Sequence, residues 1–339
     1  MMNLKPLKAS SAIWLAASTA AAVAIASAIV AGQASAAPPK ITHGVLRVNG
    51  TSASDRIALR LKAGEPGILE VDLGDDGSAD FSFNRAGIAE IAVNAGAGND
   101  LVRIDERNGA VNAGIPTTLR GGDGSDNVAG GSGAETLRGG DGSDSIDGNV
   151  DNDIAFMGDG DDTFVWDPGD GSDVIEGQDG ADTMLFNGAG AAEQVDLSAN
   201  GTRLKFFRVQ ANITMDTAGV ERVDFNALGG ADTVTVNDLK GTDVGNVNLD
   251  LAGTLGGATG DGQADRVVVR GTDGDDTIDV SGNAGGVHVG GLAATIDILH
   301  SEAANDRLEL NTLAGTDTVD SSGLVAGVIQ LFVDGVLVP

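Results

Sequence analysis

The chain of 339 residues contains no cysteine and no tyrosine, and aromatic residues make up only 3% of it. The absence of cysteine excludes a disulfide framework and any metal site built from thiolates. Basic residues are scarce, 20 against 50 acidic ones, so the formal net charge is −30. This acidity argues against nucleic acid or an anionic membrane as a partner and favours cations.

The residues that are plentiful favour strands and turns over helices. Hydrophobic residues reach 41%, so a core is available, but Val, Leu, Ile and Ala must build it. Glycine is abundant, at 52 residues, and most of the acidic residues are aspartate. Both residue types weaken helices and are common in turns. Beyond the N-terminal segment no stretch keeps a 3.6-residue periodicity, and the sequence predicts an all-β protein.

The first 36 residues have the features of a secretory signal peptide. Lys5 and Lys8 precede an Ala-rich apolar run from Ile13 to Val30, and Ala34-Ser35-Ala36 matches a small-x-small cleavage site. An uncleaved membrane anchor is the alternative, because the run is about long enough to span a bilayer. Cleavage predicts an exported protein, secreted or periplasmic, that does not insert into the membrane afterwards.

Composition divides the remaining chain into three regions. Residues 37–120 carry short apolar segments separated by Gly, Asn and Asp, as expected for an N-terminal β region. Residues 121–186 contain 15 Asp and two Glu against a single base, Arg138. Residues 187–339 return to short Val-, Leu- and Ile-rich strands with Gly-Asp turns, the pattern of a degenerate solenoid.

The middle region is a tandem repeat with a period of nine residues. The hexapeptide Gly121–Asp126 recurs letter for letter at Gly139–Asp144, 18 residues further on. The sixth place of successive units is always acidic: Asp126, Glu135, Asp144, Asp153, Asp162, Asp173 and Asp182. The eighth place is always apolar: Val128, Leu137, Ile146, Ala155, Phe164, Ile175 and Met184. A two-residue insertion, Trp166-Asp167, interrupts the phase once.

Single, looser copies of the unit lie outside this block. Gly271–Ile278 fits the unit well and places Asp276 at the sixth position, which predicts a calcium ligand there too. Weaker copies end at Asp100, Asp232 and Asp317, and for these three a turn-capping role competes equally with a role as ligand.

The repeat unit has the chemistry of a calcium site. Its glycines allow the backbone to turn sharply, which directs carbonyl oxygens inward, and the aspartate adds an anionic oxygen. Ca²⁺ prefers six to eight such oxygens, more than one turn supplies. The last three places are extended, so two units form one 18-residue coil. Coils stacked about 4.8 Å apart would bring acids 18 residues apart to the same ion.

The block resembles the RTX (repeats-in-toxin) family, the haemolysin-type calcium-binding nonapeptide Gly-Gly-x-Gly-x-Asp-x-U-x. The resemblance implies a right-handed parallel β-roll with calcium held between turns by the sixth-place carboxylates and turn carbonyls. One side of the roll would use Asp126, Asp144, Asp162 and Asp182. The other would use Glu135, Asp153 and Asp173, although Glu135 is one methylene too long. Asp126 opens the block and is expected to have a partner on one side only.

The sequence therefore predicts an exported calcium-binding protein whose repeats fold when calcium binds. Without the cation the acidic tract is expected to be a disordered segment. The alternative is a calcium-stiffened adhesion or matrix module that presents a surface to cells, polysaccharide or ice, with a row of threonines as its candidate face: Thr163, Thr183, Thr233, Thr277 and Thr318. No protein or polysaccharide partner is identifiable. His43, His288 and His300 are scattered and match no zinc-protease motif, so no enzymatic activity is expected.

Overall fold

The structure is a computed structural model that describes residues 36–339, and these form two long β-sheets. The predicted signal peptide lies outside the described residues except for its last residue. Sheet A contains, in spatial order, β1 (Lys40–Thr42), β2 (Val45–Asn49), β6 (Glu90–Ala97), β8 (Thr117–Asp123), β10 (Glu135–Asp141), β12 (Ile154–Asp159), β14 (Val174–Asp179), β18 (Ile213–Ala218), β17 (Arg203–Arg208), β16 (Gln194–Asn200), β20 (Thr233–Val236), β22 (Arg266–Arg270), β26 (Arg307–Asn311), β28 (Gln330–Val333) and β29 (Val336–Leu337).

Sheet B faces sheet A across the core. It contains, in spatial order, β27 (Thr318–Leu324), β23 (Thr277–Asn283), β24 (Gly286–Gly290), β25 (Thr295–Leu299), β21 (Asn246–Asp250), β19 (Arg222–Asn226), β15 (Thr183–Asn187), β13 (Thr163–Trp166), β11 (Ser145–Asp147), β9 (Asn127–Ala129), β7 (Leu101–Asp105), β3 (Arg56–Lys62), β4 (Glu65–Leu73) and β5 (Phe81–Asn84). Two short 3-10 helices, η1 (Arg85–Gly87) and η2 (Gln210–Asn212), complete the secondary structure of the described residues.

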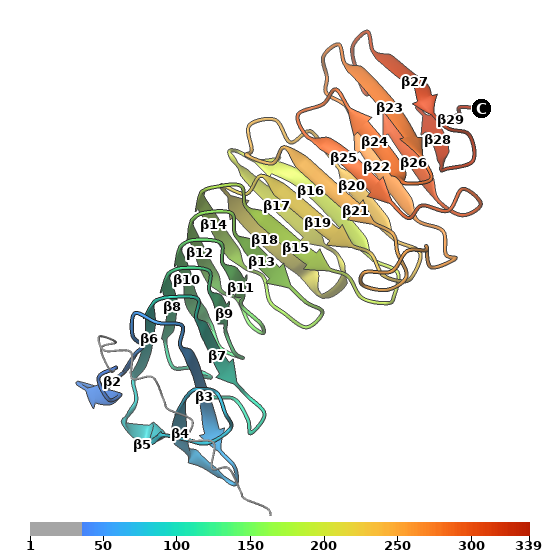
Figure 1. Cartoon of the computed structure of the whole chain (residues 1–339). Helices are drawn as coiled ribbons and strands as arrows, with labels where there is room; N and C mark the ends of the chain where they lie inside the picture. Colours follow the sequence, from blue (N-terminus) through green and yellow to red (C-terminus); the bar gives the residue numbers. More distant parts are fainter. Residues whose placement is uncertain (1–35) are drawn as a thin grey trace, which may run out of the picture. The chain divides into compact units, whose positions relative to one another are not determined.

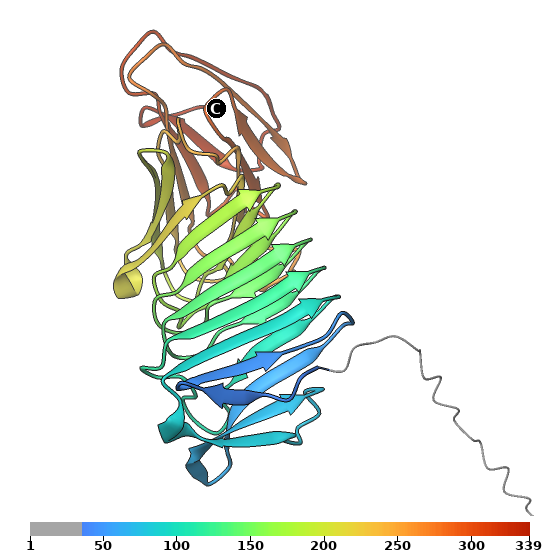
Figure 2. The same ribbon diagram turned by 90° about the vertical axis from the view of Figure 1, so that its left-hand side faces the viewer.

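The repeat block winds between the two sheets, one strand in each per coil. Successive strands β8 to β15 alternate between sheet A and sheet B, and neighbours within a sheet are parallel (Figures 1 and 2). Leu137 lies opposite Leu119, and Ile146 lies opposite Val128, both 18 residues apart. The prediction of an all-β parallel solenoid is confirmed, and so is its coil of two nine-residue units.

The eighth place of every unit points into the space between the sheets. All seven of these apolar side chains are fully buried: Val128, Leu137, Ile146, Ala155, Phe164, Ile175 and Met184. Side chains alternate across a strand, so the residues on either side of the eighth place face outward. Strands β9 and β11 bury one apolar side chain each, and β12, β13 and β15 bury two, so the core is thin and the coils depend on their neighbours for burial.

The glycine at the second place of alternate units, Gly122, Gly140 and Gly158, allows the coils to approach each other closely. Gly140 has φ +136°, and a Cβ there would lie 1.9 Å from the carbonyl oxygen of Gly122 in the preceding coil. A side chain is excluded at this position by the backbone of the neighbouring coil and by the positive φ together.

Two antiparallel insertions interrupt the solenoid beyond the repeat block. Strands β16, β17 and β18 form an antiparallel meander within sheet A, and β23, β24 and β25 form another within sheet B. The Trp166-Asp167 insertion is absorbed beside the first meander, where the Trp166 ring stacks on Phe186 at a centroid distance of 3.9 Å. Both sheets continue through residues 120 and 186, where the composition of the sequence changes.

Candidate functional site

The sixth-place acids before the strands of sheet B form one continuous stack, here called the first column. The backbone N–H of Asp126 donates to Asp144 Oδ1 at 2.7 Å, and that of Asp144 donates to Asp162 Oδ1 at 2.7 Å. Asp162 donates in the same way to Asp182 at 2.9 Å, across the two-residue insertion. The stack also begins earlier than the repeats, because Asp100 N–H donates to Asp126 Oδ1 at 2.8 Å. Asp126 therefore has neighbours on both sides, contrary to the expectation.

The acids before the strands of sheet A form the second column. Glu135 N–H donates to Asp153 Oδ1 at 2.7 Å, and Asp153 N–H donates to Asp173 Oδ1 at 2.8 Å. The structure thus places the predicted ligands in the two predicted groups, one on each side of the coil.

One oxygen of each column aspartate has a hydrogen-bond partner and the other has none. In these two columns the unpartnered atom is the buried Oδ2 of Asp100, Asp126, Asp144, Asp153, Asp162, Asp173 and Asp182. These side chains are at most 4% exposed. A buried charged oxygen without a partner is costly in free energy, so each of these atoms is a place where a cation would be stabilising.

Carbonyl oxygens gather beside the unpartnered carboxylates. A Cβ at Gly139 would lie 2.2 Å from Asp144 Oδ2 and 2.3 Å from the carbonyl oxygen of Met157 in the next coil. Gly177 has the same surroundings, with Asp182 Oδ2 at 2.5 Å and a backbone carbonyl closer still. The first glycine of the unit therefore leaves room for two hard oxygens from two coils, the donor type that Ca²⁺ prefers.

Burial strongly favours the protonated form of these carboxyls when no cation is present. Desolvation, followed by the charges of nearby acids, raises the pKa of Asp144 and Asp173 to about 7 and that of Asp153 to about 9. The same causes raise the pKa of Asp126 and Asp162 to about 6. The backbone N–H bond to each carboxylate opposes the shift and is outweighed.

Two of the predicted ligands differ from the rest because protein groups satisfy both of their oxygens. Glu135 accepts a hydrogen bond from Gly131 N–H at 2.8 Å and another from the side-chain amide of Asn112. Asp276 accepts from the backbone N–H of Thr272 at 2.7 Å and from its hydroxyl at 3.0 Å. Their carboxylates are capped locally, and they are weaker candidates for a cation than the column aspartates.

A further stack of acids, here called the third column, was missed in the sequence. It precedes strands β16, β20, β22 and β26 of sheet A. Backbone N–H groups link its members one to the next, from Glu193 to Asp232 (2.7 Å), Asp265 (2.9 Å) and Asp306 (3.0 Å). In the sequence only Asp232 stands in a recognisable copy of the unit, Gly229-Gly230-Ala231-Asp232. The spacings of 33 residues from Asp232 to Asp265 and of 41 residues from Asp265 to Asp306 hide the period. Asp276 N–H donates similarly to Asp317 Oδ1 at 3.0 Å.

Side chains alone do not complete a metal site in residues 36–339. No three His, Cys, Asp or Glu side chains there converge closely enough to hold an ion by themselves. The stacked aspartates fit calcium only if backbone carbonyl oxygens supply the remaining ligands, as the arrangement around Gly139 allows.

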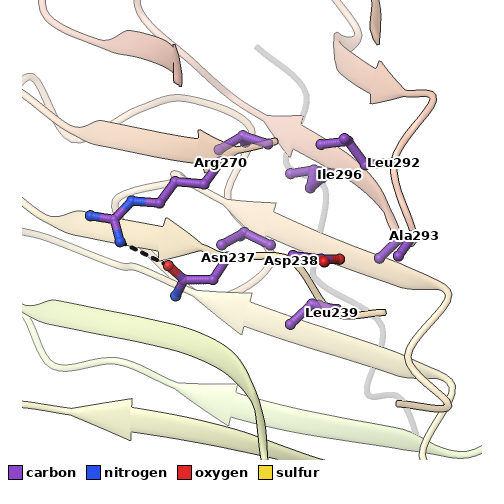
Figure 3. A pocket seen from close by; sticks show the side chains of 10 residues that line it. Asn237, Asp238, Leu239, Arg270, Leu292, Ala293 and Ile296 are labelled. Atoms are coloured by element: carbon purple, nitrogen blue, oxygen red, sulfur yellow. Dashed lines mark hydrogen bonds between the residues drawn. The ribbon is translucent and has the colours of Figure 1, made fainter. Parts of the chain in front are cut away.

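The hollows of the described region differ widely in size, and one beside His288 and Asp297 has a volume of about 440 Å³. Figure 3 shows a cavity lined by Asn237 and Arg270, whose Nη1 donates to Asn237 Oδ1 at 3.0 Å. Its volume is about 10 Å³, room for roughly one water molecule. His288 and His300 lie at the surface, where each ring nitrogen Nδ1 pairs with one aspartate, at 2.7 and 2.6 Å.

Comparison with known proteins yields one distant structural likeness to report. The chain matches no protein-family model and no curated protein sequence. It is similar to the solved structure of the extracellular lipase LipA from Serratia marcescens, with 12% identity and a TM-score of 0.23. The match covers 63% of this chain and 43% of the lipase chain, so this chain spans less than half of that protein.

The prediction of no enzymatic activity is wrong by this comparison, because the matched chain is an enzyme. That prediction relied on the lack of a recognisable catalytic motif. Residues that act together in catalysis are brought together by the fold and need not be neighbours in sequence. At this identity and TM-score the match transfers neither a reaction nor a catalytic residue to the present chain.

Residues 36–339 contain no helix with the length and apolar character needed to cross a membrane.

Proposed function

We propose that this chain is an exported calcium-binding protein of the RTX type, in which calcium ions between successive coils complete the fold. The observation that carries the proposal is the set of buried column aspartates, each with one oxygen that no protein group satisfies. In the first column Asp100, Asp126, Asp144, Asp162 and Asp182 would hold the ions. In the second column Asp153 and Asp173 would do so, with Glu135 as an end cap.

Calcium would neutralise the stacked carboxylates and bind the oxygens that the fold leaves without partners. The protein's own residues arrange this site beforehand. Each Oδ1 is oriented by a backbone N–H from the preceding coil, and the Oδ2 of Asp126, Asp144, Asp153 and Asp182 is packed over the first glycine of its own unit. The core side chain two places after the acid anchors the strand that carries it. Folding of the block would therefore be linked to calcium binding, as for other metal-dependent domains.

Export to the cell exterior or periplasm follows from the predicted signal peptide and suits a calcium-dependent fold. The adhesive alternative receives less support. Thr163 pairs with Thr183 on sheet B, and Thr277 pairs with Thr318 near the other end of that sheet. Thr233 lies on sheet A, so the five threonines form no single row.

A calcium titration followed by far-UV circular dichroism tests the proposal. In excess chelator we expect the signal of a largely unfolded chain, and millimolar Ca²⁺ should convert it to a β spectrum. Mg²⁺ is the control cation and should substitute poorly, because it requires compact octahedral coordination and retains its waters. A β spectrum and an unfolding midpoint that chelator leaves unchanged would contradict the proposal.

A further inference from the structure

Asp232 in the third column has the same unsatisfied oxygen as the repeat aspartates, although it lies outside the repeat block. Its side chain is 2% exposed. Its Oδ1 accepts the backbone N–H of Glu193 at 2.7 Å, while its Oδ2 has no hydrogen-bond partner. The preceding turn is not a glycine repeat, since Leu228 occupies a left-handed position, with φ 66°, where the repeats have glycine. The backbone nevertheless presents the aspartate in the same way.

Additional carboxylates approach Asp232 from loops that are distant in sequence. Asp261 accepts the backbone N–H of Gly230, two residues before Asp232, at 2.7 Å. Glu302 accepts the backbone N–H of Gly262, next to Asp261, at 2.6 Å. The buried Asp265 is bonded to Asp232 directly. Burial, followed by the charges of Asp265, Glu193 and Asp261, raises the pKa of Asp232 to about 8.

The neighbouring position of the same column carries its own cation. Glu193 is buried, and the guanidinium of Arg208 donates to its Oε1 through Nε at 2.6 Å. Arg208 is itself only 8% exposed. In the described residues no Lys or Arg forms a salt bridge with Asp232, Asp265 or Asp306. Asp306 is instead satisfied by the backbone N–H of Glu302, at 2.6 Å. The protein supplies positive charge at Glu193 and none at Asp232.

We infer that Asp232 anchors a separate calcium site in the third column. Its Oδ2 is the carboxylate ligand, and backbone carbonyl oxygens of the turns would supply the others, because no three acidic side chains of residues 36–339 converge closely enough to hold an ion. The inference rests on the proposed function for the identity of the ion, because hard oxygen donors select calcium in both places. It adds a site that lies outside the nonapeptide repeats.

The test replaces Asp232 by Asn and measures calcium binding to the full chain by isothermal titration calorimetry. We expect the Asp232→Asn variant to bind one calcium fewer per chain than the unmodified protein. The rise in unfolding temperature that calcium produces should also be smaller. In chelator the variant should be at least as stable as the unmodified protein, since a neutral amide replaces an unpaired buried carboxylate. A purely structural role for Asp232 would lower stability in both conditions.

Asp276→Asn is the matched control, because Thr272 already satisfies both carboxylate oxygens there. It should leave the number of bound ions unchanged. Asp144→Asn separates the two proposals. If it lowers calcium binding while Asp232→Asn does not, the third-column site is refuted and the proposed function stands. If neither variant lowers binding, both proposals are refuted. Should Asp232→Asn fail to fold, Asp232→Ser, which also removes the anionic oxygen, replaces it, with the same loss of one ion expected.

Discussion

The stability of the protein without calcium should fall as the pH rises from about 4 to about 8. The column carboxyls ionise near pH 4 in the unfolded chain, whereas burial raises their pKa in the folded chain, for example to about 7 for Asp144 and about 9 for Asp153. The folded state therefore binds more protons than the unfolded state in this range. Stability is fully present below the unfolded pKa and is lost as pH rises through the folded pKa.

The size of the effect follows from the pKa values. A tenfold change in proton affinity corresponds to about 1.4 kcal/mol, so a carboxyl with a pKa of about 6 or 7 loses about 3–4 kcal/mol over this range. The six sixth-place aspartates of the repeat block together lose on the order of 20 kcal/mol. An ordinary domain is stable by only about 5–15 kcal/mol. Ionisation of all six without a cation is therefore incompatible with the folded block at pH 8.

Urea unfolding followed by circular dichroism, in chelator and in saturating calcium, measures this dependence. In chelator we expect a folded block at pH 5 that is unfolded at pH 8. In calcium the trend should reverse, because protons compete with calcium for the same carboxylates. A free energy of unfolding that is constant, or that rises with pH in chelator, would refute the reasoning about unpartnered buried carboxylates.

Two further predictions concern the stacking of the coils. We expect Asp144→Asn and Asp126→Asn to raise the calcium concentration at the folding midpoint by similar factors, because Asp100 gives Asp126 a second neighbour in the column. Calcium titrations of both variants by circular dichroism measure these midpoints. A several-fold larger shift for Asp144→Asn would show that Asp100 does not contribute to calcium binding. Gly140→Ala should destabilise the protein by more than the about 1–2 kcal/mol of a left-handed alanine, because its Cβ would overlap the carbonyl oxygen of Gly122 in the preceding coil. Gly64→Ala is the control, because Gly64 has φ +74° and open space around it, so this variant measures the cost of the left-handed backbone alone. If urea unfolding gives the same loss of stability for both variants, the Cβ at Gly140 does not overlap the neighbouring coil.

The nine-residue phase was sufficient to predict the coil, its core and the two repeat columns. In an extended strand that carries one apolar residue at the eighth place, that side chain points into the core. Two units make one full coil, so residues 18 apart lie in the same sheet. Ile146 and Asp144 could therefore be placed from the sequence. The phase also placed Asp162 and Asp182 on the same side of the coil. Because of the two-residue insertion between them, only the structure showed that the two residues are in contact.

Only the tertiary structure decided which carboxylates keep an unpartnered oxygen. Asp276 matches the repeat consensus well, yet the Thr272 hydroxyl and N–H satisfy it, whereas Asp232 matches poorly and stays unsatisfied. The third column was hidden because antiparallel strands and loops of variable length separate its members in sequence. Arg208 reaches Glu193 from the second strand of such an insertion. Local sequence determines the path of each turn, but the charge balance of a buried carboxylate depends on every segment packed against it.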